Sequence, residues 1–284
     1  MRPAHALREL SRAVPEVAPR HLFEIAGVLV GARCCARVVM PHRAVDVAAR
    51  LFRDLGLAAG KPGVWNDVVR THGEDRFCVR RTMSDTPDAD AAVSVIVARD
   101  RVTAHDGQRI DDSGTASECG DMLGYPRCCV DSYARIEAGA DWLELLRCAL
   151  PAGLVSLPFH ANVVEGLFSR SALHPDFFPC ALGCPHAMAL VRELLDAGLS
   201  CGLDTELAEG TDRMRGRIVL LAGAAVRLRG TDGVREVHLQ PGRDPRWRHV
   251  LEQRGIEFTP TARGVVVMTP QGSLSTAGST VHFQ

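Results

Sequence analysis

Apolar residues recur at helical spacing through much of the N-terminal third of the chain. This pattern predicts one or two helices within residues 1–33 and a further amphipathic helix over residues 42–57. Short apolar runs that are typical of strands occupy three other segments, at residues 33–40, 76–83 and 91–98. We therefore expect residues 1–110 to form a small α/β domain.

Helical patterning dominates the middle of the chain. It starts at Asp112 or Ser113, because either residue is a good N-cap, and it is divided near Pro126. A further helix is expected at residues 185–198, after an irregular stretch at residues 151–179 that contains one short helix at residues 162–170. These features predict that residues 111–205 form a helical, cysteine-bearing module.

Beyond residue 210 the pattern becomes typical of strands again. Apolar runs predict strands at residues 217–228, 234–239 and 264–268, with a short helix near residues 245–254. The C-terminal segment QGSLSTAGSTVHFQ is expected to be a loose tail with at most one edge strand. With residues 206–284 as a β-rich domain, the predicted fold class of the whole chain is α+β.

The charge balance argues against two classes of partner. The 284 residues include 33 basic and 34 acidic side chains, so no net field attracts nucleic acid or an anionic membrane. The first residues lack the apolar core of a signal peptide, and the longest apolar run, Ile218 to Val226, is too short to span a bilayer. We expect a cytoplasmic protein that acts on a small molecule, and the sequence does not define its oligomeric state.

Ten cysteines are the unusual feature of the composition. They are too dilute for a disulfide-stapled miniprotein, and in a reducing compartment clustered thiols more often bind metal or do chemistry. Five of them lie in strand-like runs, on apolar helix faces or at a helix end and are interpreted as core residues: Cys34, Cys35, Cys78, Cys148 and Cys201. Cys119 is intermediate between the two interpretations.

Two of the cysteine-bearing segments, LGYPRCCVDSY and HPDFFPCALGCPHAMAL, are built alike. In the first, Pro126 suits the first turn of a helix and places Cys128 and Cys129 close to its N-terminus. In the second, either of two prolines, Pro179 or Pro185, can open the helix, and both alternatives place Cys180 and Cys184 near its start. The free N–H groups of a helix N-terminus favour thiolate, which is the form that ligates metal.

The spacing of these four cysteines favours an iron–sulfur cluster, expected to be of the [4Fe-4S] type, over zinc. A structural zinc site usually takes two pairs of ligands at spacings of a few residues, which the adjacent Cys128 and Cys129 do not supply. Neighbouring side chains point about 100° apart around a helix. We therefore expect only one of the pair, Cys128 rather than Cys129, to ligate with Cys180 and Cys184, which leaves one iron open. Zinc is the alternative.

The same residues carry a resemblance. The pattern L-G-Y-P-x-C-C, followed some fifty residues later by P-C-x3-C, resembles a family of uncharacterised prokaryotic proteins known as a domain of unknown function. The resemblance covers roughly residues 113–200 and implies a shared site without naming a reaction. Where members of the family often have serine, this chain has Ala181. The matching residues are Leu123, Gly124, Tyr125, Pro126, Cys128, Cys129, Pro179, Cys180 and Cys184.

Further candidates surround these segments. His174 and Asp176, with His160, are the expected acid–base residues, because they lie in irregular chain near the cysteines. Tyr125 and Arg127 are candidates for cofactor binding, and His186 is either a ligand or a surface residue. The leading hypothesis is an iron–sulfur enzyme with lyase, dehydratase or sulfur-transfer chemistry at an open iron. The alternatives are a zinc-stabilised binding protein without catalysis and a thiol redox protein.

Overall fold

The computed structural model describes much of the chain. The described residues are 3–15, 17, 19–62, 65–69, 78–82, 91–135, 153–157, 179–181, 183–214, 216–221, 224–229, 234–239, 257–261, 264–269, 272–276 and 278–283. Helices and strands are mixed throughout them, so the α+β fold class holds at this coarse level. The expected helices at residues 162–170 and 245–254 lie outside the described residues.

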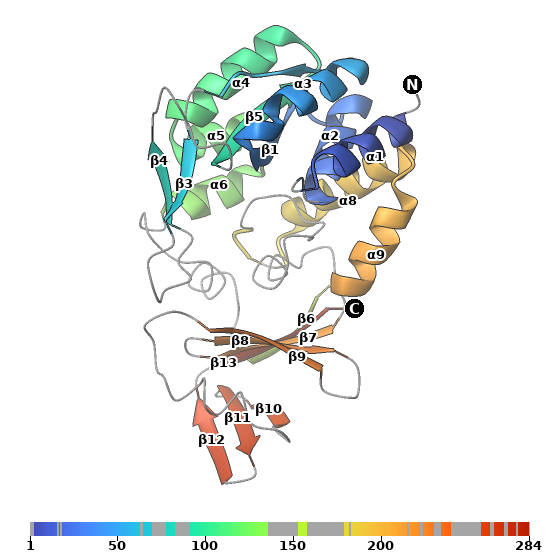
Figure 1. The fold of residues 1–284 in the computed structure, drawn as a ribbon. Helices are drawn as coiled ribbons and strands as arrows, with labels where there is room; N and C mark the ends of the chain where they lie inside the picture. The colour runs from blue at the N-terminus through green and yellow to red at the C-terminus, as the bar shows by residue number, and fades with distance from the viewer. Residues whose placement is uncertain are drawn as a thin grey trace.

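The N-terminal part contains a five-stranded antiparallel sheet in the order β1-β5-β3-β4, with β2 also paired to β5 (Figure 1). Its elements are α1 (Pro3–Ala13), α2 (Pro19–Val30), β1 (Cys35–Pro41), a short 3-10 turn (His42–Ala44), α3 (Val45–Asp54), β2 (Ala58–Ala59), β3 (Trp65–Val69), β4 (Cys78–Thr82) and β5 (Ala92–Ala98). The predicted helices and strands of this region are therefore confirmed where they are described, and β2 and β3 are strands that the pattern did not predict.

Alternate side chains of β5 point to opposite faces of the sheet, as strand geometry requires. Val93, Val95 and Val97 belong to the main core, which α1, α2 and α3 complete. Ile96 and Ala98 belong to a second apolar cluster on the other face, which α4 (Arg101–Ser113) and α5 (Ala116–Met122) cover. The sheet is thus enclosed by two helical layers.

Helix α4 corrects one expectation. Asp112 and Ser113 were expected to begin a helix, but α4 begins after Asp100, whose carboxylate accepts a hydrogen bond from Thr103 N–H at 2.9 Å, and Ser113 is its last residue. Thr115 and Glu118 then form a capping box at the start of α5. Asp100, Asp112, Ser113 and Thr115 all have side chains that suit an N-cap, so the sequence alone does not show which of them begins a helix. The helix crosses the predicted boundary at residue 110, and the domain limits stay a prediction.

Helix α8 (Pro185–Ser200) returns to the N-terminal part and packs against α2. Two glycines permit the close approach. A Cβ on Gly198 would overlap the Phe23 ring, and a Cβ on Gly27 would lie 2.8 Å from Leu194 Cδ2. Helix α9 (Asp204–Met214), which the pattern did not predict, follows, and Arg8 of α1 forms an ion pair with its Glu206 at 3.1 Å.

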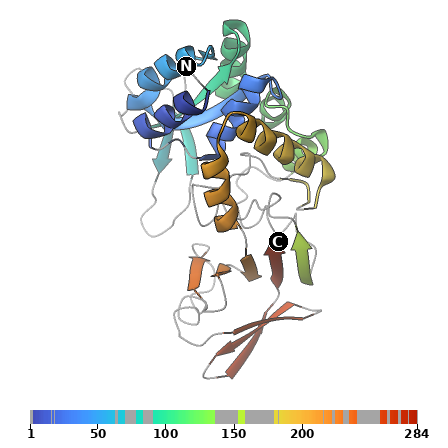
Figure 2. The same cartoon turned by 90° about the vertical axis from the view of Figure 1, so that its right-hand side faces the viewer.

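The strands near the C-terminus form two further sheets, at the end of the molecule opposite the helix-covered sheet (Figure 1, Figure 2). One has the order β6-β13-β7-β8-β9 and the other β10-β11-β12. Their bounds are β6 (Gly153–Leu157), β7 (Gly216–Leu221), β8 (Ala224–Arg229), β9 (Val234–Leu239), β10 (Glu257–Thr261), β11 (Gly264–Thr269), β12 (Gly272–Thr276) and β13 (Gly278–Phe283).

Three expectations for this region were wrong. The single strand expected at residues 217–228 is the hairpin β7–β8. The stretch at residues 151–179, expected to be irregular, contains β6. The expected loose tail forms β12 and β13, and β13 pairs with β6 on one side and β7 on the other. Polar and apolar residues alternate at residues 273–275 (Ser-Leu-Ser) and 280–283 (Thr-Val-His-Phe), which suits a half-buried strand as well as a tail.

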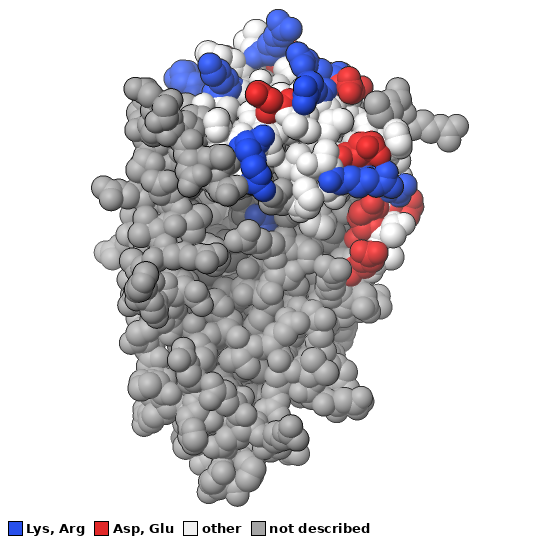
Figure 3. All heavy atoms as spheres, viewed as in Figure 1, with Lys and Arg blue, Asp and Glu red and all other residues white. Residues whose placement is uncertain are grey.

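The described surface carries both signs of charge. Basic and acidic side chains are interspersed over the coloured part of the face in Figure 3. Within the described part of the chain, we find no helix with the length and apolar character needed to cross a membrane.

The close contact between α2 and α8 gives a test by substitution. Gly198→Ala should lower the free energy of unfolding by about 1 to 3 kcal/mol, because the overlap with Phe23 outweighs the gain of roughly 1 kcal/mol in helix propensity. Leu199→Ala is the matched control, since the Leu199 side chain is exposed. Chemical denaturation would measure both, and equal effects would contradict this packing.

The buried Cys35 thiol on β1 gives a test by pH. Burial, with the neighbouring Cys34, raises the pKa of Cys35 from 9.0 to about 12. Between these values the folded state keeps a proton that the unfolded state loses, so the free energy of unfolding should fall as pH rises. Denaturation at about pH 8 and about pH 10.5 should show a smaller fall for Cys35→Ala than for the parent protein. Val38→Ala, a buried change on the same strand, should keep the parent's pH dependence.

Candidate metal centre

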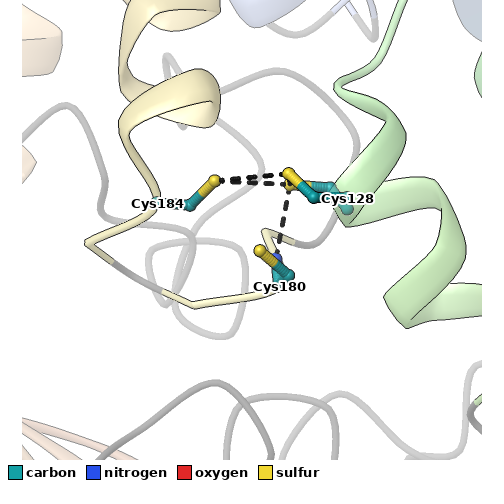
Figure 4. Close-up of side chains that lie close together, drawn as sticks. Cys128, Cys180 and Cys184 are labelled. Carbon is teal, nitrogen blue, oxygen red and sulfur yellow. Dashed lines mark hydrogen bonds between the residues drawn. The ribbon is translucent and has the colours of Figure 1, made fainter.

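Four cysteines from two separate segments meet beside the helix-covered sheet. Cys128 and Cys129 lie in the first turn of α6 (Arg127–Ala134), while Cys180 and Cys184 flank the turn that leads into α8. Figure 4 shows the Cys184 side chain directed toward Cys128 at the start of α6, with Cys180 close to both. Cys129 and Cys180 are 51 positions apart in the sequence, so tertiary packing brings them together.

The sulfur atoms are mutually close. Cys128 Sγ lies 3.9 Å from Cys129 Sγ and 3.7 Å from Cys184 Sγ, and the Cys129 and Cys184 sulfurs are 3.8 Å apart. With Cys180 included, all four sulfurs lie within 4.8 Å of one another. These four cysteines could hold a metal ion.

Both members of the adjacent pair bring their sulfur atoms to the site. That Cys128 rather than Cys129 ligates stays a prediction. Side chains of a helix tilt toward its N-terminus, and in the first turn no preceding turn lies beneath them. Two consecutive sulfurs can therefore converge beyond the helix end. Gly124, at φ 69°, provides the left-handed residue after α5 that turns the chain toward Pro126.

The second pair is placed by the N-terminus of α8. Of the two prolines that could open this helix, Pro185 does so, and Cys184 is the N-cap residue. The backbone N–H of Cys184 donates to the carbonyl of Ala181 at 2.9 Å, which closes a turn between Cys180 and Cys184. The backbone N–H of Cys180 donates to Cys129 Sγ at 3.4 Å and ties this turn to α6.

The pKa values of three of these thiols depart from the ordinary value of a cysteine. Burial raises the pKa of Cys129 and, together with the Cys184 and Cys128 thiols, raises the pKa of Cys180 to about 11. Burial also acts to raise the pKa of Cys184, but the backbone amides of Ala187 and His186 and the neighbouring thiols outweigh it and lower this pKa. Cys184 therefore ionises more readily than Cys129 or Cys180, as a helix N-terminus favours. Since metal ligation needs thiolates, loading should release protons.

The centre is buried on one side only. Cys129 and Cys184 are 1% and 4% exposed, whereas Cys128 and Cys180 are partly exposed. Ala187 and Leu190 of α8 pack against the sulfurs, and Tyr125 contacts them from the α5–α6 connection. Of the two residues suggested for cofactor binding, Tyr125 thus lies at the cluster. Arg127 is exposed and forms ion pairs with Asp121 at 2.7 Å and Asp131 at 2.9 Å.

The remaining candidates lie elsewhere. His160, His174 and Asp176, the expected acid–base residues, lie outside the described residues, so their role stays a prediction. His186 is exposed in the first turn of α8 and is not among the four grouped ligands. Cys201 is buried in the main core and Cys35 in the second apolar cluster, as expected, whereas Cys34 is exposed and its expected place in the core was wrong. Cys119 is buried with its thiol directed at the Ile110 carbonyl at 3.4 Å.

A group of buried charges near the centre was missed by the sequence analysis. His21 and Glu24 of α2 and Arg33, which follows α2, are each at most 7% exposed. Glu24 Oε1 lies 3.9 Å from Arg33 Nη1, and Glu24 Oε2 lies 3.9 Å from His21 Nδ1. The signal available in the sequence was the presence of two ionisable residues three positions apart inside the apolar helix α2.

Substitution separates the four grouped cysteines from buried cysteines in the core. Cys129→Ser and Cys184→Ser should each abolish metal retention, because each removes a sulfur ligand from a site with four. Cys201→Ser, at a position with 5% exposure in the core, is the matched control and should retain metal. Metal content after gel filtration measures all three. Loss of metal from the Cys201 variant alone would place the site elsewhere.

Comparisons with known proteins found no match of any kind: no family model, no curated protein and no solved structure matches the chain. The resemblance to an uncharacterised prokaryotic family therefore stays a prediction. The geometry of the four sulfurs is the basis for the function proposed below.

Proposed function

We propose that one thiophilic metal ion, zinc on the grounds of its coordination chemistry, is bound by Cys128, Cys129, Cys180 and Cys184 together. The ion would stabilise the contact between two helical layers of a non-catalytic binding protein. The observation that carries the proposal is the mutual distance of the sulfurs, from 3.7 to 3.9 Å for three of them and below 4.8 Å for all four. This spacing suits a single ion.

The argument from distance is geometric. A tetrahedral zinc ion holds each sulfur at about 2.3 Å, which places any two sulfurs about 3.8 Å apart. In a four-iron cluster each cysteine binds a different iron, so the sulfurs surround a larger object and stand farther apart. The short distances thus favour one ion over a cubane cluster. Four cysteine ligands and no open position are typical of structural zinc sites.

The position of the site explains what such an ion does. Helix α6 is joined through α5 to α4, which covers one face of the sheet, and Gly120 of α5 packs directly against Val130 of α6. Helix α8 packs against α2 on the other face. An ion bound by both α6 and the start of α8 links the two layers at the edge of the sheet. Metal binding is then coupled to folding.

Specific features also keep an iron–sulfur enzyme as the second candidate. Cys128 and Cys180 are partly exposed, and a cluster that acts on a small molecule through an open iron must be reachable from solvent. In this alternative the sulfurs move apart when the cluster is assembled. His160, His174 and Asp176 remain its proposed acid–base residues, and the reaction remains of the lyase, dehydratase or sulfur-transfer type.

Metal analysis of protein purified without oxygen distinguishes the two candidates. We expect about one equivalent of zinc for each chain, no acid-labile sulfide and no broad visible absorbance. Removal of the ion by a chelator should lower the melting temperature, because an ion that binds only the folded state stabilises it. Readdition of zinc should restore the melting temperature.

Matched measurements give the controls. The Cys184→Ser variant should melt at the temperature of the chelated parent protein and should not respond to zinc. Iron together with acid-labile sulfide, in protein loaded with both metals available, would overturn the single-ion proposal in favour of the cluster. A melting temperature that does not respond to chelator or zinc would overturn the clamp.

A further inference from the structure

Arg33 is a buried cation whose charge is only partly balanced. Its side chain is 3% exposed, and neither Nη1 nor Nη2 has a hydrogen-bond partner among the described residues. The carboxylate of Glu24 lies 3.9 Å from Nη1, beyond hydrogen-bond distance. Burying a charged guanidinium costs free energy unless nearby negative charge stabilises it. We therefore expect a further anionic group close to Arg33.

The surroundings of Arg33 lead to the four cysteines. Its guanidinium carbon lies 5.2 Å from the centroid of the Tyr125 ring, within the range of a cation–π contact. The same Tyr125 side chain packs against the apolar cluster that contains Cys129 and Cys184. One aromatic ring therefore contacts both the guanidinium and the apolar cluster that contains the sulfur atoms.

The fold holds the side chain of Arg33 in this place. The backbone N–H of Arg33 donates to the carbonyl of Gly27 at 3.1 Å. A Cβ on Gly27 would lie 3.4 Å from Cγ and Cδ of Arg33 and 2.8 Å from Leu194 of α8, so the absence of a side chain lets both residues approach α2. The close packing of α2 and α8 thus positions the cation as well as the thiols.

Four thiolates around a divalent ion carry a net charge of about −2, and this charge must be balanced where two of the sulfurs are buried. We propose that Arg33 is the positioning cation of the metal centre: it stabilises the tetrathiolate complex across the Tyr125 ring and so raises the metal affinity. This inference rests on the proposed function and adds a residue to it.

Other cations near the cysteines fit this role less well. Arg127 precedes Cys128 directly, but its side chain is 66% exposed and pairs with two carboxylates, so solvent and these partners screen it. Arg37 of β1 forms an ion pair with Asp111 of α4 at 3.6 Å. Arg33 combines burial with contact to the ring that touches the sulfurs.

Replacing Glu24 tests the proposal through the direction in which the metal affinity changes. Its carboxylate neutralises part of the Arg33 charge, so removing it should strengthen the field that Arg33 exerts on the thiolates. If the ion pair had only a structural role, Arg33→Met and Glu24→Gln would break the same contact, and both would weaken metal binding. The proposal instead predicts opposite changes in metal affinity for the two variants.

The experiment measures zinc affinity by competition with a chromophoric chelator, using the full-length protein. Arg33→Met should weaken zinc binding about tenfold, the lower end of what residues behind metal ligands contribute. Glu24→Gln should tighten binding by a few-fold. Arg8→Met, which breaks the separate ion pair with Glu206, is the control and should bind zinc as the parent does. Cobalt substitution should give the same tetrahedral spectrum in all four proteins.

The outcomes separate this inference from the proposed function. Weakened affinity in both variants, or parent-like affinity in Arg33→Met, would overturn the role of Arg33 while leaving the metal centre in place. Failure of the parent protein to bind zinc or cobalt would overturn the proposed function and the role of Arg33 with it. If Arg33→Met does not fold, Glu24→Gln decides by itself: tighter binding supports the proposal and weaker or unchanged binding overturns it.

Discussion

The close packing of helix α8 against helix α2 is the contact on which the candidate metal centre depends. The Phe23 ring packs against Gly198, and Leu194 packs against Gly27. Because neither glycine has a side chain, the two helices approach more closely than larger residues would permit. That contact fixes the position of α8 relative to α2, and therefore the place of Cys184 at the start of α8. Helix α6 packs on α5, which belongs with α4 to the layer on the other face of the sheet. The sulfurs meet where the start of α6 approaches the start of α8 (Figure 4).

Burial and charge then set the chemistry of the centre. Burial raises the pKa of Cys129 and of Cys180, so these thiols hold their protons until something replaces them. The start of α8 acts in the other direction at Cys184, whose pKa is lowered by backbone amides against the effect of burial. A site with these properties is poised for an ion that displaces protons and joins the helices. The buried Arg33 places a positive charge 5.2 Å from the centroid of the Tyr125 ring, which packs against the cysteine cluster.

Local patterns predicted the local elements well. The apolar run at residues 91–98 forms β5, and residues 234–239 form β9. Helix α8 begins at Pro185, which was one of the two prolines predicted to open it. Errors arose where several residues could serve the same purpose or where pairing partners were distant. Asp100 rather than Asp112 caps α4, and the C-terminal segment became β13 because β6 and β7 lie on either side of it.

The sequence by itself determined that two helix N-termini carry pairs of cysteines, because prolines, glycines and apolar spacing act over a few neighbouring residues. Only the tertiary structure decided that Cys128 and Cys129 both reach the site, and that all four sulfurs lie within 4.8 Å. Cys129 and Cys180 stand 51 positions apart, and their distance is set by the packing of layers. The burial of Arg33 depends on that packing too, since a charged residue beside an apolar helix is equally compatible with a solvated surface.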